Sequence, residues 1–229
     1  MMGGRIAFGS LPYDMAHMLG GAMLVLSFAL LYQRRIGTVI NIYALQGIVL
    51  AVAAAWQGFI HAAPHLYVTA AIAFGAKAVA IPIALHWVVQ RLKVHRQIET
   101  ALGIFPSMIL GVGLVVLSIM VVMPTTLAAQ AQTLTREDLA MALSVVLLGL
   151  LMMITRRNAL TQVIGFMSLE NGLILAAVGI AGMPMVVELS SAFLVLVVFI
   201  VFGVFFFRIR ERFDSLDVAH LDRVGGTHK

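Results

Sequence analysis

Apolar residues fall in seven long runs that are separated by short polar segments. A helix needs about 20 apolar residues to cross the hydrocarbon core of a bilayer. Each run is close to that length or longer, so the pattern predicts seven membrane-spanning helices. We place them at residues 15–33, 36–60, 66–90, 101–123, 138–155, 159–181 and 184–207. The sequence therefore predicts an all-α polytopic membrane protein.

The segments between the runs contain turn and charge signals. QRRIG follows the first run, HAAPH the second and QRLKVHRQIET the third. The longest segment, PTTLAAQAQTLTRED, contains Thr135 and, three residues later, Asp138. This spacing predicts a helix start at Thr135, and we expect a loop or a small surface helix before it.

Composition agrees with a membrane protein and excludes several kinds of site. Hydrophobic residues make up 62% of the 229 residues, charged residues 11%, and the mean hydropathy is +1.04. No polar stretch is long enough for a soluble domain, so we expect one helical membrane unit. The chain has no cysteine, which excludes disulfides, thiolate metal sites and iron–sulfur ligation within it. Any redox chemistry therefore belongs to a partner.

The basic residues predict the orientation. If the C-terminus is cytoplasmic, twelve of the fifteen basic residues lie on the cytoplasmic side, whereas Arg5 and Arg136 lie on the other. The remaining one, Lys77, is within a span. This bias follows the positive-inside rule, so we expect the N-terminus outside and the C-terminus in the cytoplasm.

Two ionisable residues fall at span midpoints, Lys77 in the third and Glu170 in the sixth. A lysine or an acid at the centre of a membrane helix costs about 2.5–3.5 kcal/mol on insertion scales. Such residues are functional candidates by default. The structural alternative is a buried hydrogen bond or ion pair that only stabilises the fold.

A helical wheel separates the two residues. In the sixth span the small residues share one face, which predicts close helix packing. They are Gly165, Ser168, Gly172, Ala176 and Gly179. Glu170 lies about 160° from the centre of that face, so we expect it to meet a second subunit or, alternatively, a water-containing cavity.

Lys77 shares its side of the third span with small residues, which predicts that it points into a tight helix interface. These residues are Ala70, Ala73, Ala80 and Ala84. The wheel leaves a direct Lys77–Glu170 pair open. Gly75 and Pro82 lie on either side of Lys77, and we expect Pro82, which lacks a backbone donor, to kink the helix.

Three further positions have weaker signals. Glu188 near the outer end of the seventh span and His86 near the cytoplasmic end of the third could pass protons, or could be solvated or structural. His61 and His65 are four residues apart without a nearby acid or cysteine, so we expect no metal site.

The stretch RRNALTQVIGFMSLENG, residues 156–172, resembles the E subunit of hydrogenase-4, of the membrane-bound formate hydrogenlyase family. The C-terminal half of that subunit is itself similar to the K-type subunit of respiratory complex I. The resemblance extends through AFGAKAVAIP in the third span and LDVAHL near the C-terminus. It implies a four-span region at 1–135, a K-like three-span region at 136–207 and a cytoplasmic tail at 208–229.

The resemblance implies a non-catalytic subunit in the cell (inner) membrane of a bacterium or archaeon. Its complex would join a cytoplasmic hydrogenase-type oxidoreductase to antiporter-like subunits that move protons or sodium ions. A membrane subunit similar to the H-type subunit of complex I would be a further partner. Iron–sulfur clusters and a nickel–iron centre would belong to the partners, with no cofactor in this chain and no nucleic acid bound.

Matched residue by residue, Glu170 and Asn171 correspond to an intramembrane acid–amide pair of that family, and Lys77 to its third-span lysine. Arg156, Arg157 and Asn158 correspond to the cytoplasmic side of the K-like region, where partners make contact. The chain departs from the complex I subunit in two ways. Met167 occupies the place of the sixth-span acid, and the seventh span, FLVLVVFIVF, has no mid-membrane acid, Glu188 being about two turns away.

We therefore expect Glu170 to be one station in a lateral path of acids, lysines, histidines and water across several subunits. The proton affinity of a buried carboxyl depends on nearby charges, so a moving positive charge could switch it. The alternatives are a small subunit of a multi-subunit cation/proton antiporter, an independent solute permease, and a structural scaffold between antiporter-like subunits.

Overall fold

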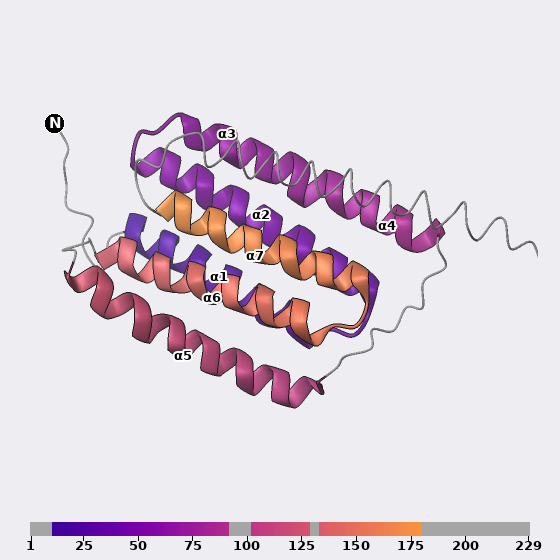
Figure 1. Ribbon diagram of the computed structural model, residues 1–229. Helices are drawn as coiled ribbons and strands as arrows, with labels where there is room; N and C mark the ends of the chain where they lie inside the picture. The colour runs from indigo at the N-terminus through magenta and orange to yellow at the C-terminus, as the bar shows by residue number, and fades with distance from the viewer. Residues whose placement is uncertain (1–10, 92–101, 129–132, 180–229) are drawn as a thin grey trace, which may run out of the picture. The chain divides into compact units, whose positions relative to one another are not determined.

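The computed structural model describes residues 11–91, 102–128 and 133–179. The chain divides into two units, residues 1–188 and 189–229, and all described residues belong to the first. Six stretches of helix are long and apolar enough to cross a membrane (Figure 1). They are α1 (Leu11–Tyr32), α2 (Ile36–Ile60), a third span of α3 (His65–Ile72), η1 (Ala73–Ala80) and α4 (Ile81–Arg91), α5 (Ile104–Ala128), α6 (Thr133–Thr155) and α7 (Ala159–Gly179). The prediction of a multi-pass all-α protein is confirmed, and the seventh predicted span, 184–207, lies outside the described residues.

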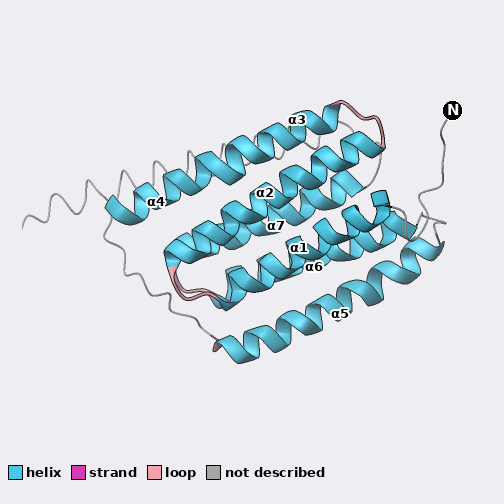
Figure 2. Ribbon diagram, turned by 180° about the vertical axis from the view of Figure 1, so that it is seen from behind, coloured by secondary structure: helices cyan, strands magenta, loops and turns pink. Residues whose placement is uncertain are grey.

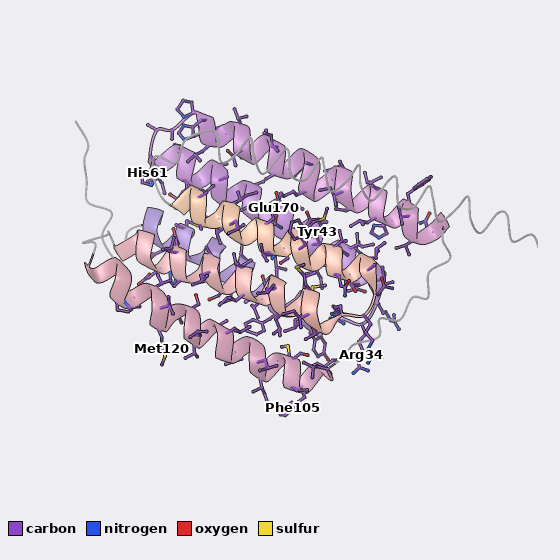
Figure 3. The ribbon with its side chains drawn as sticks, viewed as in Figure 1. Arg34, Tyr43, His61, Phe105, Met120 and Glu170 are labelled. Carbon is purple, nitrogen blue, oxygen red and sulfur yellow. The ribbon has the colours of Figure 1, made fainter. Side chains whose placement is uncertain are left out.

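Four helices, α1, α2, α6 and α7, pack on one another, while α5 lies against α6 and α1 and the third span against α2 (Figures 1 and 2). The outer helix α5 is the most exposed, and Phe105 and Met120 point away from the other helices (Figure 3). In a membrane such apolar side chains meet lipid or neighbouring subunits.

The contact between α6 and α7 depends on glycines. A Cβ added at Gly149 would lie 2.6 Å from the backbone nitrogen of Leu169, and one at Gly172 would lie 2.8 Å from the backbone nitrogen of Val146. Only glycine fits where two backbones approach so closely. The small-residue face predicted for the sixth span is therefore confirmed, and its partner is α6.

The predicted span limits agree with α2 at both ends, but the fourth span continues past Pro124 to Ala128 and α6 begins at Thr133 rather than Thr135. Proline removes one backbone donor, yet membrane helices tolerate this loss when local adjustments satisfy the freed carbonyl. The prediction that the helix ends before Pro124 was therefore wrong.

The third span contains a π-helix, η1, directly before Pro82. A π-helix has more residues per turn than an α-helix and often occurs at functional sites. The wider turn shifts the buried face, so that Ala73, Lys77, Ile81 and Leu85 are buried whereas Ala80 is exposed. The wheel was therefore right for Lys77 and wrong for Ala80. Pro82 follows η1 within this continuous span, so it lies in the interior of a membrane helix, where the loss of one backbone donor can be tolerated.

Candidate functional site

Lys77 reaches the interior because α2 approaches η1 very closely at this level. A Cβ at Gly47 of α2 would lie 2.9 Å from the backbone nitrogen of Ala78 and 3.0 Å from the carbonyl carbon of Lys77. The absent side chain at Gly47 therefore allows η1 to pack directly on α2. Lys77 is 3% exposed, so its ammonium is inside the bundle.

The Lys77 ammonium meets the acid and the amide that the sequence places at the centre of α7. Its Nζ donates to Oδ1 of Asn171 at 2.8 Å and lies 3.1 Å from Oε2 of Glu170. Glu170 is 4% exposed. The expectation that Glu170 faces a second subunit or a cavity was therefore wrong: the small face of α7 packs on α6, and Glu170 pairs with Lys77 of the third span in the same chain.

Hydrogen bonds continue from Asn171 into α2 and α1. Asn171 Nδ2 donates to Oε1 of Gln46 at 3.1 Å, and Gln46 Nε2 lies 3.0 Å from both Ser27 Oγ and Ser168 Oγ. Ser27 Oγ in turn donates to the carbonyl of Met23 at 2.9 Å. We call this set of six buried side chains, from four helical spans, the mid-bundle network: Ser27, Gln46, Lys77, Ser168, Glu170 and Asn171.

The bonds of the mid-bundle network share one direction, since each donor points away from the ammonium. Lys77 donates to Asn171, Asn171 to Gln46, and Gln46 to the serines. Aligned hydrogen bonds polarise one another and stabilise the charge at their start. Amide groups do not readily give up a proton, so this row of hydrogen bonds holds Lys77 in place and does not relay protons; the titratable groups of the network are Lys77 and Glu170.

Tyr43 is a further buried polar residue near Glu170. Its side chain is fully buried on α2, and Glu170 is close enough to act on it electrostatically (Figure 3). Within the described residues, neither the Tyr43 hydroxyl nor the two Glu170 carboxyl oxygens has a partner in good hydrogen-bond geometry. The carboxyl of Glu170 is therefore held mainly by its ion pair with Lys77, and the Tyr43 hydroxyl is a further polar group near it.

Arg156 is buried, unlike a residue that contacts partners. Its Nη2 donates to the carbonyls of Leu30, Leu31 and Gln33 at 3.1, 2.7 and 2.8 Å, which satisfies the end of α1. Burial lowers the pKa of its guanidinium, and Arg34 nearby lowers it further. An arginine remains charged even so. Arg156 therefore joins α1 to the α6–α7 connection.

Its two sequence neighbours have different surroundings. Asn158 caps α7, because its Oδ1 accepts a bond from the backbone nitrogen of Leu160 at 2.9 Å. Arg157 is exposed and stays a candidate for partner contacts. His86 is half-buried, and its Nδ1 donates to the carbonyl of Pro82 at 2.9 Å. Glu188 lies outside the described residues.

The sequence interpretation singled out Lys77, Glu170 and Asn171 but missed Gln46, Ser27, Ser168 and Tyr43. Gln46 offered a usable signal, since an amide near the middle of an apolar span needs a polar partner. Serine and tyrosine are common in membrane helices, so their positions alone gave none. The meeting of these side chains depends on helix pairing that a single sequence does not specify.

Comparisons with known proteins give relatives across most of the chain. It is 28% identical over 210 residues to hydrogenase-4 component E of Escherichia coli strain K12, covering 91% of this chain and 96% of that protein. It is 26% identical over 207 residues to the uncharacterized protein Rv0085 of Mycobacterium tuberculosis, covering 88% of this chain and 91% of that protein. No family model and no solved structure matches the chain.

Proposed function

We propose that this chain, a homologue of hydrogenase-4 component E, is a membrane subunit of a hydrogenase complex. In this complex the Lys77–Glu170 pair takes part in ion translocation. The proposed complex lies in a bacterial inner membrane and contains a cytoplasmic hydrogenase-type arm and antiporter-like subunits. This chain links the two parts and does no redox chemistry itself. The translocated ion is a proton or a sodium ion.

The observation that most supports the proposal is the burial of Lys77 and Glu170, 3.1 Å apart, at the middle of the bundle. Well-packed apolar residues in place of a buried ion pair are often equally stable or more so. Stability therefore gives little reason to keep both charges inside a membrane. Intramembrane acids and lysines are typical of ion paths.

The geometry suggests how the pair works. When Glu170 is ionised, Lys77 has two acceptors, the carboxylate at 3.1 Å and the Asn171 carbonyl at 2.8 Å. When Glu170 takes up a proton, its attraction for Lys77 falls, but Asn171 still holds the ammonium. Glu170 thus changes charge without releasing Lys77. A positive charge that arrives in or leaves a neighbouring subunit alters the balance between these two states.

The test begins with purification of the assembly through a tag on this chain, followed by mass spectrometry of the partners. We expect hydrogenase-like and antiporter-like subunits. Recovery of the chain alone would overturn membership of the complex.

The second step is to compare Glu170→Gln with Asp14→Asn, a control that alters an exposed acid on α1. In Glu170→Gln we expect hydrogenase activity with artificial electron carriers to persist and ion translocation per electron to be lost. The control should keep both. Full translocation in Glu170→Gln would refute a role of the pair, and a complex that fails to assemble would assign the pair to assembly.

A further inference from the structure

A second polar group lies at the end of the bundle opposite to Arg156. Here α1, α2, α6 and α7 surround a small cavity, which we call the end cavity. The residues that line it include Ala16, Ala53, Gln57, Asp138 and Gly179. Gln57 and Asp138 supply the polar side chains of this lining.

Only 4% of the surface of Gln57 is exposed, yet one of the two polar atoms of its side-chain amide has no partner among the described residues. Its Nε2 donates to Oδ2 of Asp138 at 3.2 Å. Its Oε1 has no hydrogen-bond partner among the described residues. A buried polar atom without a partner costs about 1–3 kcal/mol, so such an atom in a cavity usually marks a bound water.

The size of the end cavity fits this interpretation. It has room for about one water molecule. A buried water needs at least two polar partners, and Gln57 Oε1 and the Asp138 carboxyl are both available. We infer that the end cavity holds a water molecule between Gln57 and Asp138, and that Asp138 exchanges protons with it.

The exchange needs no further reactant. A hydronium ion that reaches the cavity gives one proton to a carboxylate oxygen of Asp138, which leaves a neutral acid and one water, and release is the reverse. Gln57 Nε2 donates to the carboxyl in its charged form. Among the described residues, the titratable groups that act on Asp138 are His17 of α1 and Glu137 of α6, which are themselves 3.2 Å apart, whereas α2 and α7 present Gln57 and Gly179.

The end cavity is separate from the mid-bundle network. Gln46 and Gln57 are eleven residues apart on α2, roughly 16 Å along the helix axis. Apolar side chains fill the space between them, and Met23, Leu50 and Val145 are fully buried there. Asp138 therefore exchanges protons with the end of the bundle and not directly with Glu170, so the inference stands whether or not Glu170 moves ions.

The test is infrared difference spectroscopy of the full-length protein, with whatever subunits accompany it, in lipid nanodiscs in H₂O and D₂O. We expect a protonated carboxyl band that titrates with pH and shifts in D₂O. It should be present in the wild type and in Asp14→Asn, and absent from Asp138→Asn, which is isosteric and keeps the acceptor for Gln57. Identical spectra of the wild type and Asp138→Asn would overturn the inference.

A second variant tests the water. Ala53→Val narrows the cavity with an apolar methyl pair and leaves every titratable group in place. We expect the Asp138 band to remain, with deuterium exchange several-fold slower than in the wild type. An unchanged rate of deuterium exchange at Asp138 would show that Asp138 does not exchange protons through water in the end cavity. A stable fold can be checked by comparing the thermal unfolding of each variant with that of Asp14→Asn.

Discussion

The mid-bundle network and the end cavity each contain a buried acid, Glu170 of α7 and Asp138 of α6, but the two acids have different surroundings. In the network, Glu170 has a lysine at 3.1 Å, and amides and serines hold that lysine. In the end cavity, Asp138 has one neutral amide donor and a small space beside it. The first arrangement keeps a charge inside the membrane, whereas the second gives an acid access to water. The surroundings of a buried acid thus determine what it can do.

The largest expected effect comes from removal of the cation in the network. Lys77→Met leaves Glu170 buried without a counter-charge in the described part of the chain, and breaking a buried pair in this way costs about 3–5 kcal/mol. We expect a large fall in the free energy of unfolding, measured by SDS titration of the detergent-purified protein. The double variant Lys77→Met with Glu170→Gln should recover much of the loss, because it leaves no isolated charge. Wild-type stability in Lys77→Met would contradict this account.

The next effect tests how the network is assembled. Gly47→Ala places a methyl group 2.9 Å from the backbone of Ala78, so η1 must move away from α2. Overpacking of this kind costs about 1–3 kcal/mol. The shift should also weaken the bond from Lys77 to Asn171, so Lys77→Met should cost less free energy of unfolding in the Gly47→Ala background than in the wild type.

The matched control for this prediction is Gly37→Ala on the same helix, where an added Cβ meets no atom within 4 Å. We expect Gly37→Ala to be as stable as the wild type or slightly more so, because alanine favours helix over glycine. Equal losses in the two variants would show that the contact between Gly47 and η1 does not explain the effect.

Much of the fold could be predicted because the membrane imposes it. The length of apolar runs gave α2 at both ends, and the spacing of small residues gave the face of α7 that packs on α6. Bilayer thickness sets the length of an apolar run, and close packing sets the spacing of small residues, so both can be recognised in a short stretch of sequence. The π-helix η1 could not be predicted in this way, because the length of an apolar run does not specify the number of residues per helical turn.

The candidate sites also differ in whether local sequence reveals them. Lys77 and Glu170 stood out because charges at span midpoints are expensive. Asp138 did not, because an acid at the start of a span is an ordinary feature of a helix N-terminus. Its significance comes from Gln57, which is 81 residues away in the sequence and 3.2 Å away in space. A helical wheel also could not tell that Glu170 meets the third span, since it contains no information on which helices are neighbours.

A smaller effect is expected at the end cavity. Gln57→Met removes the donor to Asp138, but it also removes the unpartnered Oε1, and these two changes oppose each other. The net change in the free energy of unfolding should be about 1 kcal/mol or less. Deuterium exchange at Asp138 should nevertheless change, because the water loses one of its two partners. A loss as large as that of Lys77→Met would show that Gln57 is a structural bond of the same kind as the network.

The smallest effect on stability is expected at Tyr43. Tyr43→Phe removes a buried hydroxyl that has no described partner. The free energy of unfolding should therefore stay the same or rise by no more than about 0.5 kcal/mol. The functional effect should be larger. When Glu170 is protonated and its attraction for Lys77 falls, the Tyr43 hydroxyl can serve as its hydrogen-bond partner. Tyr43→Phe removes this partner, so we expect ion translocation per electron to fall while hydrogenase activity is kept. Unchanged translocation together with unchanged stability would contradict a role for Tyr43 and would leave Lys77 and Asn171 as the groups that control Glu170.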